Sequence, residues 1–318
     1  MDQIAAQRIV TCILNGRAGS NAASTVVDRV AELFAAHGAK AEMVVVDHPR
    51  LLTSLARTHA DDPGRTIVAA GGDGTVSAVA SALAGKPAAL GILPLGTLNH
   101  FAKDVGIPVD LDRAIDTILN GIAREVDVGE VNGNIFVNNS SIGLYPAIVR
   151  VRSAQQNRGT GKWLAFLRAV YKVMRRCPSF YASLHANGQL EAPRKTPFIF
   201  VGNNRYETTG LRIGERDRVD GGHLWVCQAP GANRASLLRM ALRAVLGKTT
   251  PGELRVLETD ELWVHTRRNR RRVRVANDGE VFTTTAPLHY RIRPKALRVM
   301  VPAGKKYGET NAGRSGAD

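Results

Sequence analysis

Two short segments of the chain combine glycine with residues suited to holding phosphate. The first, Gly71-Gly72-Asp73-Gly74-Thr75, follows an apolar run and leads into a helical pattern. Glycine lets phosphate oxygens approach the backbone without meeting a Cβ, and a helix that begins here directs N–H groups and its dipole at an anion. A carboxylate suits such a loop only if it holds Mg²⁺ or meets a hydroxyl, which singles out Asp73. A simple strand–helix connection would have the same composition.

The second segment, residues 93–102, reads LPLGTLNHFA and also follows an apolar run. Gly96 allows a close approach of ligand, while Thr97 and Asn99 carry hydroxyl and amide groups suited to phosphate or adenine. The carboxyl ends of neighbouring parallel strands open onto the same edge of a sheet, where ligands of such folds bind. Two glycine turns at adjacent strand ends therefore predict a nucleotide site.

The surrounding residues alternate between β-like runs and amphipathic helical patterns, which is typical of a parallel α/β sheet. Strands are expected at residues 8–14, 41–46, 66–70 and 88–93. Helices are expected at residues 20–37, 50–59, 75–83 and 111–120. The sequence thus predicts an α/β nucleotide-binding domain over residues 1–126.

The pattern changes after residue 126, where strand-like runs follow one another without regular helices between them. Strands are expected at residues 135–139, 179–186, 197–202, 223–229, 261–267 and 273–276, and helices at 161–176 and 234–246. Asn187-Gly188 and Asp220-Gly221-Gly222 are turn signals. These patterns predict a mainly β domain over residues 127–287. Residues 288–303, with a strand at 297–301, are expected to return to the first domain, and the polar tail 304–318 is expected to be disordered.

The bulk composition narrows the function less than the motifs do. A net charge of +15 favours nucleic acid, an anionic membrane surface or a phosphorylated substrate, without choosing among them. Cys12, Cys177 and Cys227 lie far apart without metal-ligand spacing, which indicates reduced thiols in a cytoplasmic protein. The apolar run at residues 9–14 is too short for a signal peptide, and no membrane-spanning stretch is expected.

GGDGT followed by PLGTLNHFAKDVGIP resembles the catalytic domain of the diacylglycerol kinase family. That family includes bacterial lipid kinases and is related to the sphingosine and ceramide kinases within an NAD kinase-like superfamily. The resemblance continues in Asp127-Val128-Gly129, in Phe136–Asn139 with Ser141 and Gly143, and in Asn277–Glu280. It covers nearly the whole chain up to Val301, in the order and spacing of the family.

The resemblance implies a fold, an activity and a set of site residues. The fold is a Rossmann-like α/β nucleotide domain followed by a β-sandwich, with the active site in the cleft between them. The activity is transfer of phosphate from ATP to a lipid hydroxyl. The residues implied to bind the nucleotide are Asn15, Gly71, Gly72, Gly74, Thr75, Gly96, Thr97 and Asn99.

The same resemblance implies catalytic carboxylates. Asp278 would be the general base, with Asp73 and Glu280 as the other catalytic residues, and Mg²⁺ would be held by Asp73, Asp127 and Glu280. Each has a plainer interpretation. Asp278-Gly279 could be only a hairpin turn, and Asp127 could satisfy local backbone amides.

The chain departs from the family pattern at two places. His100 stands where most members have aspartate, and an imidazole does not replace a carboxylate as a ligand of a hard cation. Gly221 and Trp225 occupy positions that are acidic in some members, where a structural divalent ion binds. We therefore assign no such ion and expect Mg²⁺ to arrive with ATP.

A basic run, RRNRRRVR at residues 267–274, suits docking on an anionic bilayer or forms a solvated hairpin tip. The apolar stripe of residues 163–174 faces either the core or the membrane interface. We expect a cytoplasmic protein that binds peripherally to the inner face of the membrane, with no nucleic-acid partner. Two alternative functions stay open: NAD kinase, and a basic lipid- or nucleic-acid-binding protein without catalysis. The identity of the lipid and the formation of a homodimer also stay open.

Overall fold

The computed structural model describes residues 9–16, 20–46, 48–143, 179–207, 216, 218–229, 231, 254–266 and 272–304 of the 318-residue chain. The chain forms two compact units. Unit 1 consists of residues 1–126, 216–221 and 295–318, and unit 2 of residues 127–215 and 222–294. The expected helices at 161–176 and 234–246, four arginines of the basic run (267, 268, 270 and 271) and the expected tail beyond Gly304 lie outside the described residues.

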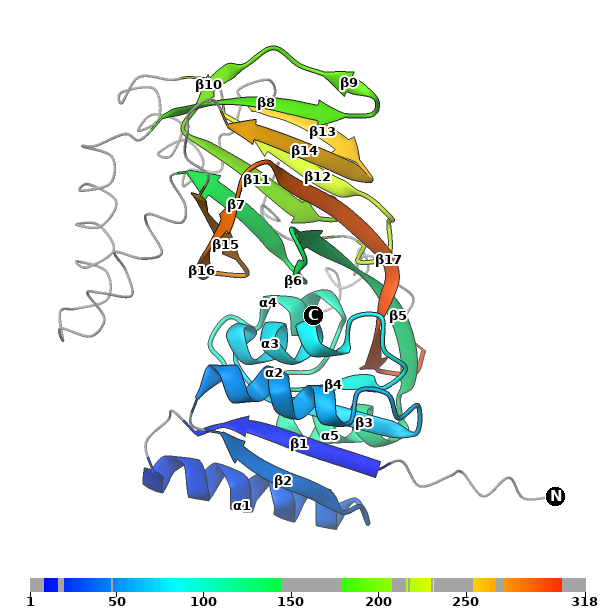
Figure 1. The fold of residues 1–318 in the computed structure, drawn as a ribbon. Coiled ribbons are helices and arrows are strands. Elements are labelled where there is room, and N and C mark those ends of the chain that lie inside the picture. The colour runs from blue at the N-terminus through cyan, green and yellow to red at the C-terminus, as the bar shows by residue number, and fades with distance from the viewer. Residues whose placement is uncertain are drawn as a thin grey trace, which may run out of the picture. The chain divides into compact units, whose positions relative to one another are not determined.

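Unit 1 is built on a parallel sheet in the order β2-β1-β3-β4 (Figure 1). Its strands are β1 (Ile9–Asn15), β2 (Ala41–Val46), β3 (Arg65–Gly71) and β4 (Ala89–Pro94). The central strands are almost continuously apolar and buried, as expected of parallel strands covered on both faces. The last part of β17 (Leu288–Val301) adds to β4, with Val299 opposite Leu90.

Helices cover this sheet on both faces. They are α1 (Ser20–Ala36), α2 (Pro49–Thr58), α3 (Asp73–Leu83), α4 (His100–Asp104) and α5 (Leu111–Asn120). α2 packs against α3, while α1 packs against α5, and Figure 1 shows α1 and α2 on opposite sides of the β1–β2 pair. Within the described part of the chain, no helix has the length and apolar character needed to cross a bilayer.

The first sheet of unit 2 has the order β10-β8-β14-β17, with the first part of β17 as a member. Its elements are β8 (Phe180–Ala186), β9 (Gln189–Leu190), β10 (Arg194–Thr196) and β14 (Glu261–Thr266). β9 pairs with β8 through the expected Asn187-Gly188 turn, where both residues have positive φ. β5 (Ile122–Val131) pairs with β17 and with β6 (Asn134–Phe136).

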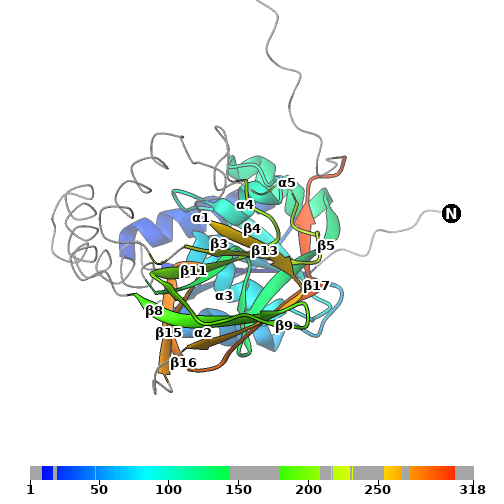
Figure 2. The ribbon, with the colours of Figure 1, turned by 90° about the horizontal axis from the view of Figure 1, so that it is seen from above.

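The second sheet of unit 2 is antiparallel, in the order β13-β12-β11-β7-β15-β16. Its strands are β7 (Asn139–Gly143), β11 (Phe198–Asn203), β12 (Leu224–Gln228), β13 (Arg255–Thr259), β15 (Arg272–Asn277) and β16 (Glu280–Thr285). β15 and β16 form a hairpin and lie side by side in both ribbon views (Figures 1 and 2). The two sheets together make a β-sandwich.

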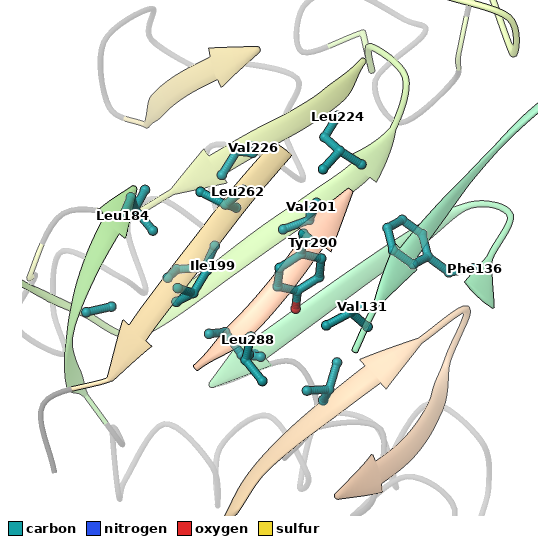
Figure 3. Packing of buried hydrophobic residues seen from close by; sticks show 14 of the residues in the cluster. Val131, Phe136, Leu184, Ile199, Val201, Leu224, Val226, Leu262, Leu288 and Tyr290 are labelled. Atoms are coloured by element: carbon teal, nitrogen blue, oxygen red, sulfur yellow. The ribbon is translucent and has the colours of Figure 1, made fainter. Parts of the chain in front are cut away.

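Alternate residues of both sheets of unit 2 meet in one core (Figure 3). Val201 and Val226 come from the second sheet, while Leu262 and Tyr290 come from the first. The Tyr290 ring is fully buried, and burial raises the pKa of its hydroxyl above the ordinary range. That hydroxyl lies 3.2 Å from Ser140 Oγ, so the one polar atom of the ring has a partner.

The structure corrects several expected boundaries. β5 was not expected, because its sequence IAREVDVGEV mixes charged residues into the strand. The single strand expected at 135–139 is divided into β6 and β7, because the Asp278 side chain takes the N–H groups of Val137, Asn138 and Asn139. β9, β10, β13 and β16 are further strands that the patterns did not indicate. β17 begins at Leu288, well before residue 297, and the chain returns to unit 1 at Lys295, later than the expected residue 288.

The Ser140–Tyr290 pair generates a stability prediction. Ser140→Ala should lower the free energy of unfolding by about 1–3 kcal/mol, because it leaves a buried hydroxyl without a partner. Ser140→Ala combined with Tyr290→Phe should recover most of that loss, because neither polar group is then present. Urea unfolding of both variants and of Tyr290→Phe alone measures this. A double variant as unstable as the sum of the single losses would contradict the coupling.

Candidate functional site

The residues between β3 and α3 form a tight glycine turn, here called the phosphate loop (Gly71–Thr75). A Cβ on Gly71 would lie 2.4 Å from Thr75 Oγ1, so the turn closes only with glycine at this position. Gly72 is the N-cap of α3, and no side chain caps the helix. Because the first N–H groups of a helix have no partner within it, this end of α3 suits an anion.

The residues after β4 form a second turn, Gly96–Asn99, which the Asn99 side chain holds together. Asn99 has a left-handed backbone with φ of 50° and is buried. Its Nδ2 donates to the carbonyl oxygens of Pro94 (3.2 Å) and Gly96 (2.8 Å). Its Oδ1 accepts the N–H of Gly96 at 3.1 Å. These bonds give Asn99 a role in shaping the turn.

The phosphate loop and the second turn touch through their backbones. The N–H of Leu95 donates to the carbonyl oxygen of Gly71 at 3.0 Å. A Cβ on Gly96 would lie 2.6 Å from the Cα of Gly72, so no larger residue fits at position 96 without moving one of the turns. The two segments that the sequence singled out are therefore adjacent at one edge of the sheet.

A pocket of about 330 Å³ opens beside the phosphate loop. Its lining comes from β1, α1, β2, β3 and the start of α3, and consists of Leu14, Asn15, Gly16, Val26, Val27, Val45, Ala70, Gly71, Gly72, Thr75 and Leu95. One side is apolar. On the other, Asn15 Nδ2 donates to Thr75 Oγ1 at 3.5 Å, which joins the end of β1 to the first turn of α3. An apolar wall next to a helix end that suits an anion has the features needed for a flat base and its phosphates.

The predicted nucleotide-binding residues take different places around this pocket. Asn15, Gly71, Gly72 and Thr75 belong to its lining. Asp73 and Gly74 are half-buried in the first turn of α3. The Asp73 carboxylate interacts favourably there with the positive end of the helix dipole. Gly96 lies against Gly72 of the phosphate loop, Asn99 lies next to Gly96, and Thr97 is exposed.

The apolar wall was not found from the sequence. Val26 and Val27 lie on α1 and Val45 lies on β2, and an apolar pair on a helix facing a sheet is ordinarily part of the core. Their position in the sequence could have indicated the wall, because α1 follows the end of β1 and Val45 is the next-to-last residue of β2. The start of α1 and the end of β2 both lie near the carboxyl edge of the sheet.

Unit 2 holds Asp278 at the tip of the β15–β16 hairpin. Asp278 and Gly279 have φ of 48° and 87° and form the two-residue turn. The Asp278 carboxylate accepts three backbone N–H groups: Oδ2 from Val137 (2.9 Å), and Oδ1 from Asn138 (2.8 Å) and Asn139 (3.0 Å). Such donors stabilise the ionised carboxylate.

The segment that Asp278 binds is fixed from other directions as well. Asn203 Nδ2 donates to the carbonyl oxygens of Asp127 and Val137, both at 2.9 Å. The Tyr206 hydroxyl donates to the carbonyl oxygen of Asn138 at 3.0 Å. A buried, hydrogen-bonded network of this kind holds its members in one arrangement.

The predicted metal ligands are distributed over both units. Asp73 belongs to unit 1, while Asp127 and Glu280 belong to unit 2. Asp127 is buried, and its Oδ2 accepts the N–H of Gly222 at 2.7 Å, whereas Glu280 is exposed. Among the described residues, no three histidine, cysteine, aspartate or glutamate side chains gather into a group that could hold a metal ion.

The residues that depart from the family pattern have structural surroundings of their own. His100 is exposed at the start of α4. Trp225 is buried on β12 and makes ring contacts with Phe200 and Tyr206, with centroids 6.0 Å away in both cases. An aromatic cluster therefore occupies the place of the acidic residue.

The two described cysteines are poor nucleophiles. Cys12 lies inside β1 and Cys227 inside β12, and burial raises the pKa of each thiol to about 12. Because the thiolate is the reactive form, chemistry by these residues is disfavoured near neutral pH.

Comparison with known proteins agrees with this architecture. Residues 9–131 match the diacylglycerol kinase catalytic domain, and residues 145–301 match the YegS C-terminal NAD kinase beta sandwich-like domain. A probable lipid kinase YegS-like of Pseudomonas aeruginosa is 34% identical over 252 residues, which cover 75% of this chain and 77% of that protein. A diacylglycerol kinase of Bacillus subtilis is 50% identical over 76 residues, which span 23% of this chain and only 25% of that protein.

Solved structures share the fold. A putative diacylglycerol kinase from Bacillus anthracis aligns over 93% of this chain and 98% of its own with a TM-score of 0.71 at 21% identity. An NAD kinase from Archaeoglobus fulgidus, solved in complex with ATP, aligns over 93% of this chain and 94% of its own with a TM-score of 0.51 at 11% identity. The two matched domains are those of a lipid kinase family with a diacylglycerol kinase catalytic domain. The chain belongs to the YegS-like family of lipid kinases.

The anchoring of Asp278 generates a prediction that the sequence alone did not. Asp278→Asn should lower the free energy of unfolding by about 1–3 kcal/mol, because an amide cannot accept all three N–H groups. Glu280→Gln, two residues away and exposed, is the matched control and should change stability by less than about 0.5 kcal/mol. Chemical unfolding measures both. Equal stability of Asp278→Asn and the wild type would contradict the anchoring role.

Proposed function

We propose that the chain is an ATP-dependent lipid kinase that transfers the γ-phosphate of ATP to a hydroxyl group of a membrane lipid. The observation that carries this proposal is the backbone contact between the phosphate loop and the second turn, beside a pocket of about 330 Å³. The family supplies the class of acceptor. Diacylglycerol, ceramide and sphingoid bases all present such a hydroxyl.

The nucleotide would lie along the carboxyl edge of the sheet of unit 1. Its phosphates would meet the N–H groups at the start of α3, and Thr75 would add a hydroxyl. The adenine would fit the apolar wall formed by Val26, Val27 and Val45. The ATP complex of the Archaeoglobus fulgidus NAD kinase supports the use of ATP by this fold.

Asp73, Asp127 and Glu280 carry the hard oxygen atoms that magnesium prefers, but within the described residues they do not form a preassembled group of ligands. When bound with ATP, Mg²⁺ would neutralise charge on the transferred group. We propose that it arrives with the nucleotide, since Gly221 and Trp225 replace carboxylates that hold a resident ion in some relatives.

Asp278 would orient the lipid hydroxyl and take its proton as the new O–P bond forms. A general base has to be ionised before it accepts a proton. The three backbone N–H groups that Asp278 accepts favour that form and fix the position of the carboxylate. Anchoring of the turn and catalysis are thus compatible roles of one side chain.

NAD kinase is the second candidate, because it has a similar fold and the same GGDGT loop. The segment PLGTLNHFAKDVGIP and the YegS-like relatives favour the lipid kinase. A catalytically inactive lipid-binding protein is opposed by the presence of Asp73, Asp278 and Glu280. Nucleic-acid binding is opposed by an aromatic content of only 5%, because bases are usually stacked on aromatic side chains.

We further propose that the enzyme docks peripherally on the cytoplasmic face of the membrane, where its substrate resides. The basic run at residues 267–274 supplies the attraction, at roughly 1 kcal/mol for each basic residue near an anionic surface. Within the described residues of this run, Arg272 and Arg274 are exposed on β15.

A labelled-ATP assay with Mg²⁺, NAD and a panel of diacylglycerol, ceramide, sphingoid base and phosphatidylglycerol tests the proposed function. The wild type should label at least one lipid, and Asp73→Asn and Asp278→Asn should each lower turnover by about 100-fold or more. Asp116→Asn, an exposed position on α5, is the control and should retain activity. Labelling of NAD with no lipid labelled would favour the NAD kinase, and wild-type turnover by Asp73→Asn would contradict the assigned role.

Vesicle binding tests the membrane proposal. Replacing Arg270, Arg271 and Arg272 by serine should weaken binding to anionic vesicles, and wild-type binding should weaken with salt as the Debye length falls from about 10 Å at 0.1 M to about 3 Å at 1 M. Serine at the exposed Arg194, Arg205 and Arg218 gives a control with the same change in charge. A raised KM for ATP with intact vesicle binding would instead place the basic run at the nucleotide.

A further inference from the structure

A buried ion pair lies at the end of α4 in unit 1. Arg216 donates from Nε to Asp104 Oδ2 at 2.8 Å, and its Nη2 donates to the same oxygen. The Arg216 side chain has no exposed area, and that of Asp104 is 16% exposed. The guanidinium also lies 6.0 Å from the centre of the Phe101 ring. The sequence patterns gave no indication of this contact.

The helix that receives Arg216 is too short to be stable by itself. α4 has five residues, whereas isolated helices shorter than about 12 residues are marginal in water. Its position therefore depends on tertiary contacts. Phe101 of this helix is fully buried. Asp104, the last residue of the helix, is held by the ion pair with Arg216.

α4 continues directly from the second turn. Asn99 is the N-cap of α4, and its side chain shapes the turn around Gly96. Gly96 in turn lies against Gly72 of the phosphate loop. A continuous series of contacts thus leads from Arg216 through α4 and Asn99 to the backbone that is proposed to meet ATP.

Arg216 belongs to a short segment, residues 216–221, that is part of unit 1 although the residues before and after it in the sequence belong to unit 2. Val219 is buried, and Asp220 pairs with Arg218 (3.0 Å) and Arg124 (3.6 Å). The contact with Asp104 is thus one of several that hold this segment, and it joins the segment to α4.

We propose that Arg216 is a positioning residue for nucleotide binding: by holding Asp104 it fixes α4, and with it the second turn against the phosphate loop. This inference rests on the proposed function for the identity of the nucleotide. Arginine suits the task because its planar fork can direct two N–H groups at one carboxylate, which a point charge cannot do.

The test compares Arg216→Met with Arg218→Met, which removes an ion pair of the same segment without touching α4. Calorimetric titration with Mg-ATP should give a Kd raised about tenfold in Arg216→Met, because small displacements of positioning groups are costly. Arg218→Met should match the wild type. The KM for ATP should rise more than the KM for the lipid, which a general loss of stability would not cause well below the melting temperature.

Hydrogen exchange provides a readout that does not depend on activity. The N–H groups of Lys103 and Val105, which donate to Asn99 and Phe101, should exchange faster in Arg216→Met, while those of α5 should not. If Arg216→Met does not fold, Asp104→Asn is judged by the same two measurements. Unchanged exchange in α4, or an unchanged Kd for Mg-ATP, would overturn the inference. A wild type that binds ATP but labels no lipid would contradict the proposed function and not the role of Arg216. That role is still decided by the Kd for Mg-ATP and by hydrogen exchange in α4.

Discussion

Parallel pairing of β3 with β4 sets Gly71 opposite Pro94, and the candidate nucleotide site depends on this register. It brings the phosphate loop and the second turn to the same edge of the sheet, where their backbones touch at Gly72 and Gly96. A shift of one residue would turn the side chains of a strand to its other face. Glycine at position 96 is therefore a steric requirement of this contact, because a Cβ there would lie 2.6 Å from the Cα of Gly72.

Unit 2 contributes a different kind of constraint, in which a charged side chain binds backbone N–H groups. Asp278 stands at a hairpin tip, yet its carboxylate accepts three N–H groups from Val137, Asn138 and Asn139, where β6 leads into β7. Asn203 and Tyr206 hold the same segment from other elements. These donors favour the ionised form of the carboxylate and hold it in one position, and both effects suit a general base. The plain interpretation of Asp278 as a turn residue and the catalytic proposal thus describe the same geometry.

The outcome for the predicted elements follows their physical character. Apolar runs such as Ala41–Val46 and the amphipathic helix Leu111–Asn120 have the expected bounds, because their periodicity reflects burial on a sheet or a helix face. The prediction failed for β5, whose charged residues hide the strand pattern, and for residues 135–139, where a distant side chain replaces ladder hydrogen bonds. Those errors arise from tertiary contacts that no local pattern contains.

The sequence by itself determined the two glycine turns, the α/β and β order of the elements and the family, since these depend on local spacing. Only the tertiary structure decided that Asn99 serves its own turn, that Val26, Val27 and Val45 form an apolar wall, and that Arg216 reaches Asp104. The apolar wall and the ion pair join residues from separate elements, and Arg216 and Asp104 are more than a hundred positions apart. Local periodicity reports which face of an element is buried, but the partner across a contact is fixed only when the whole chain packs.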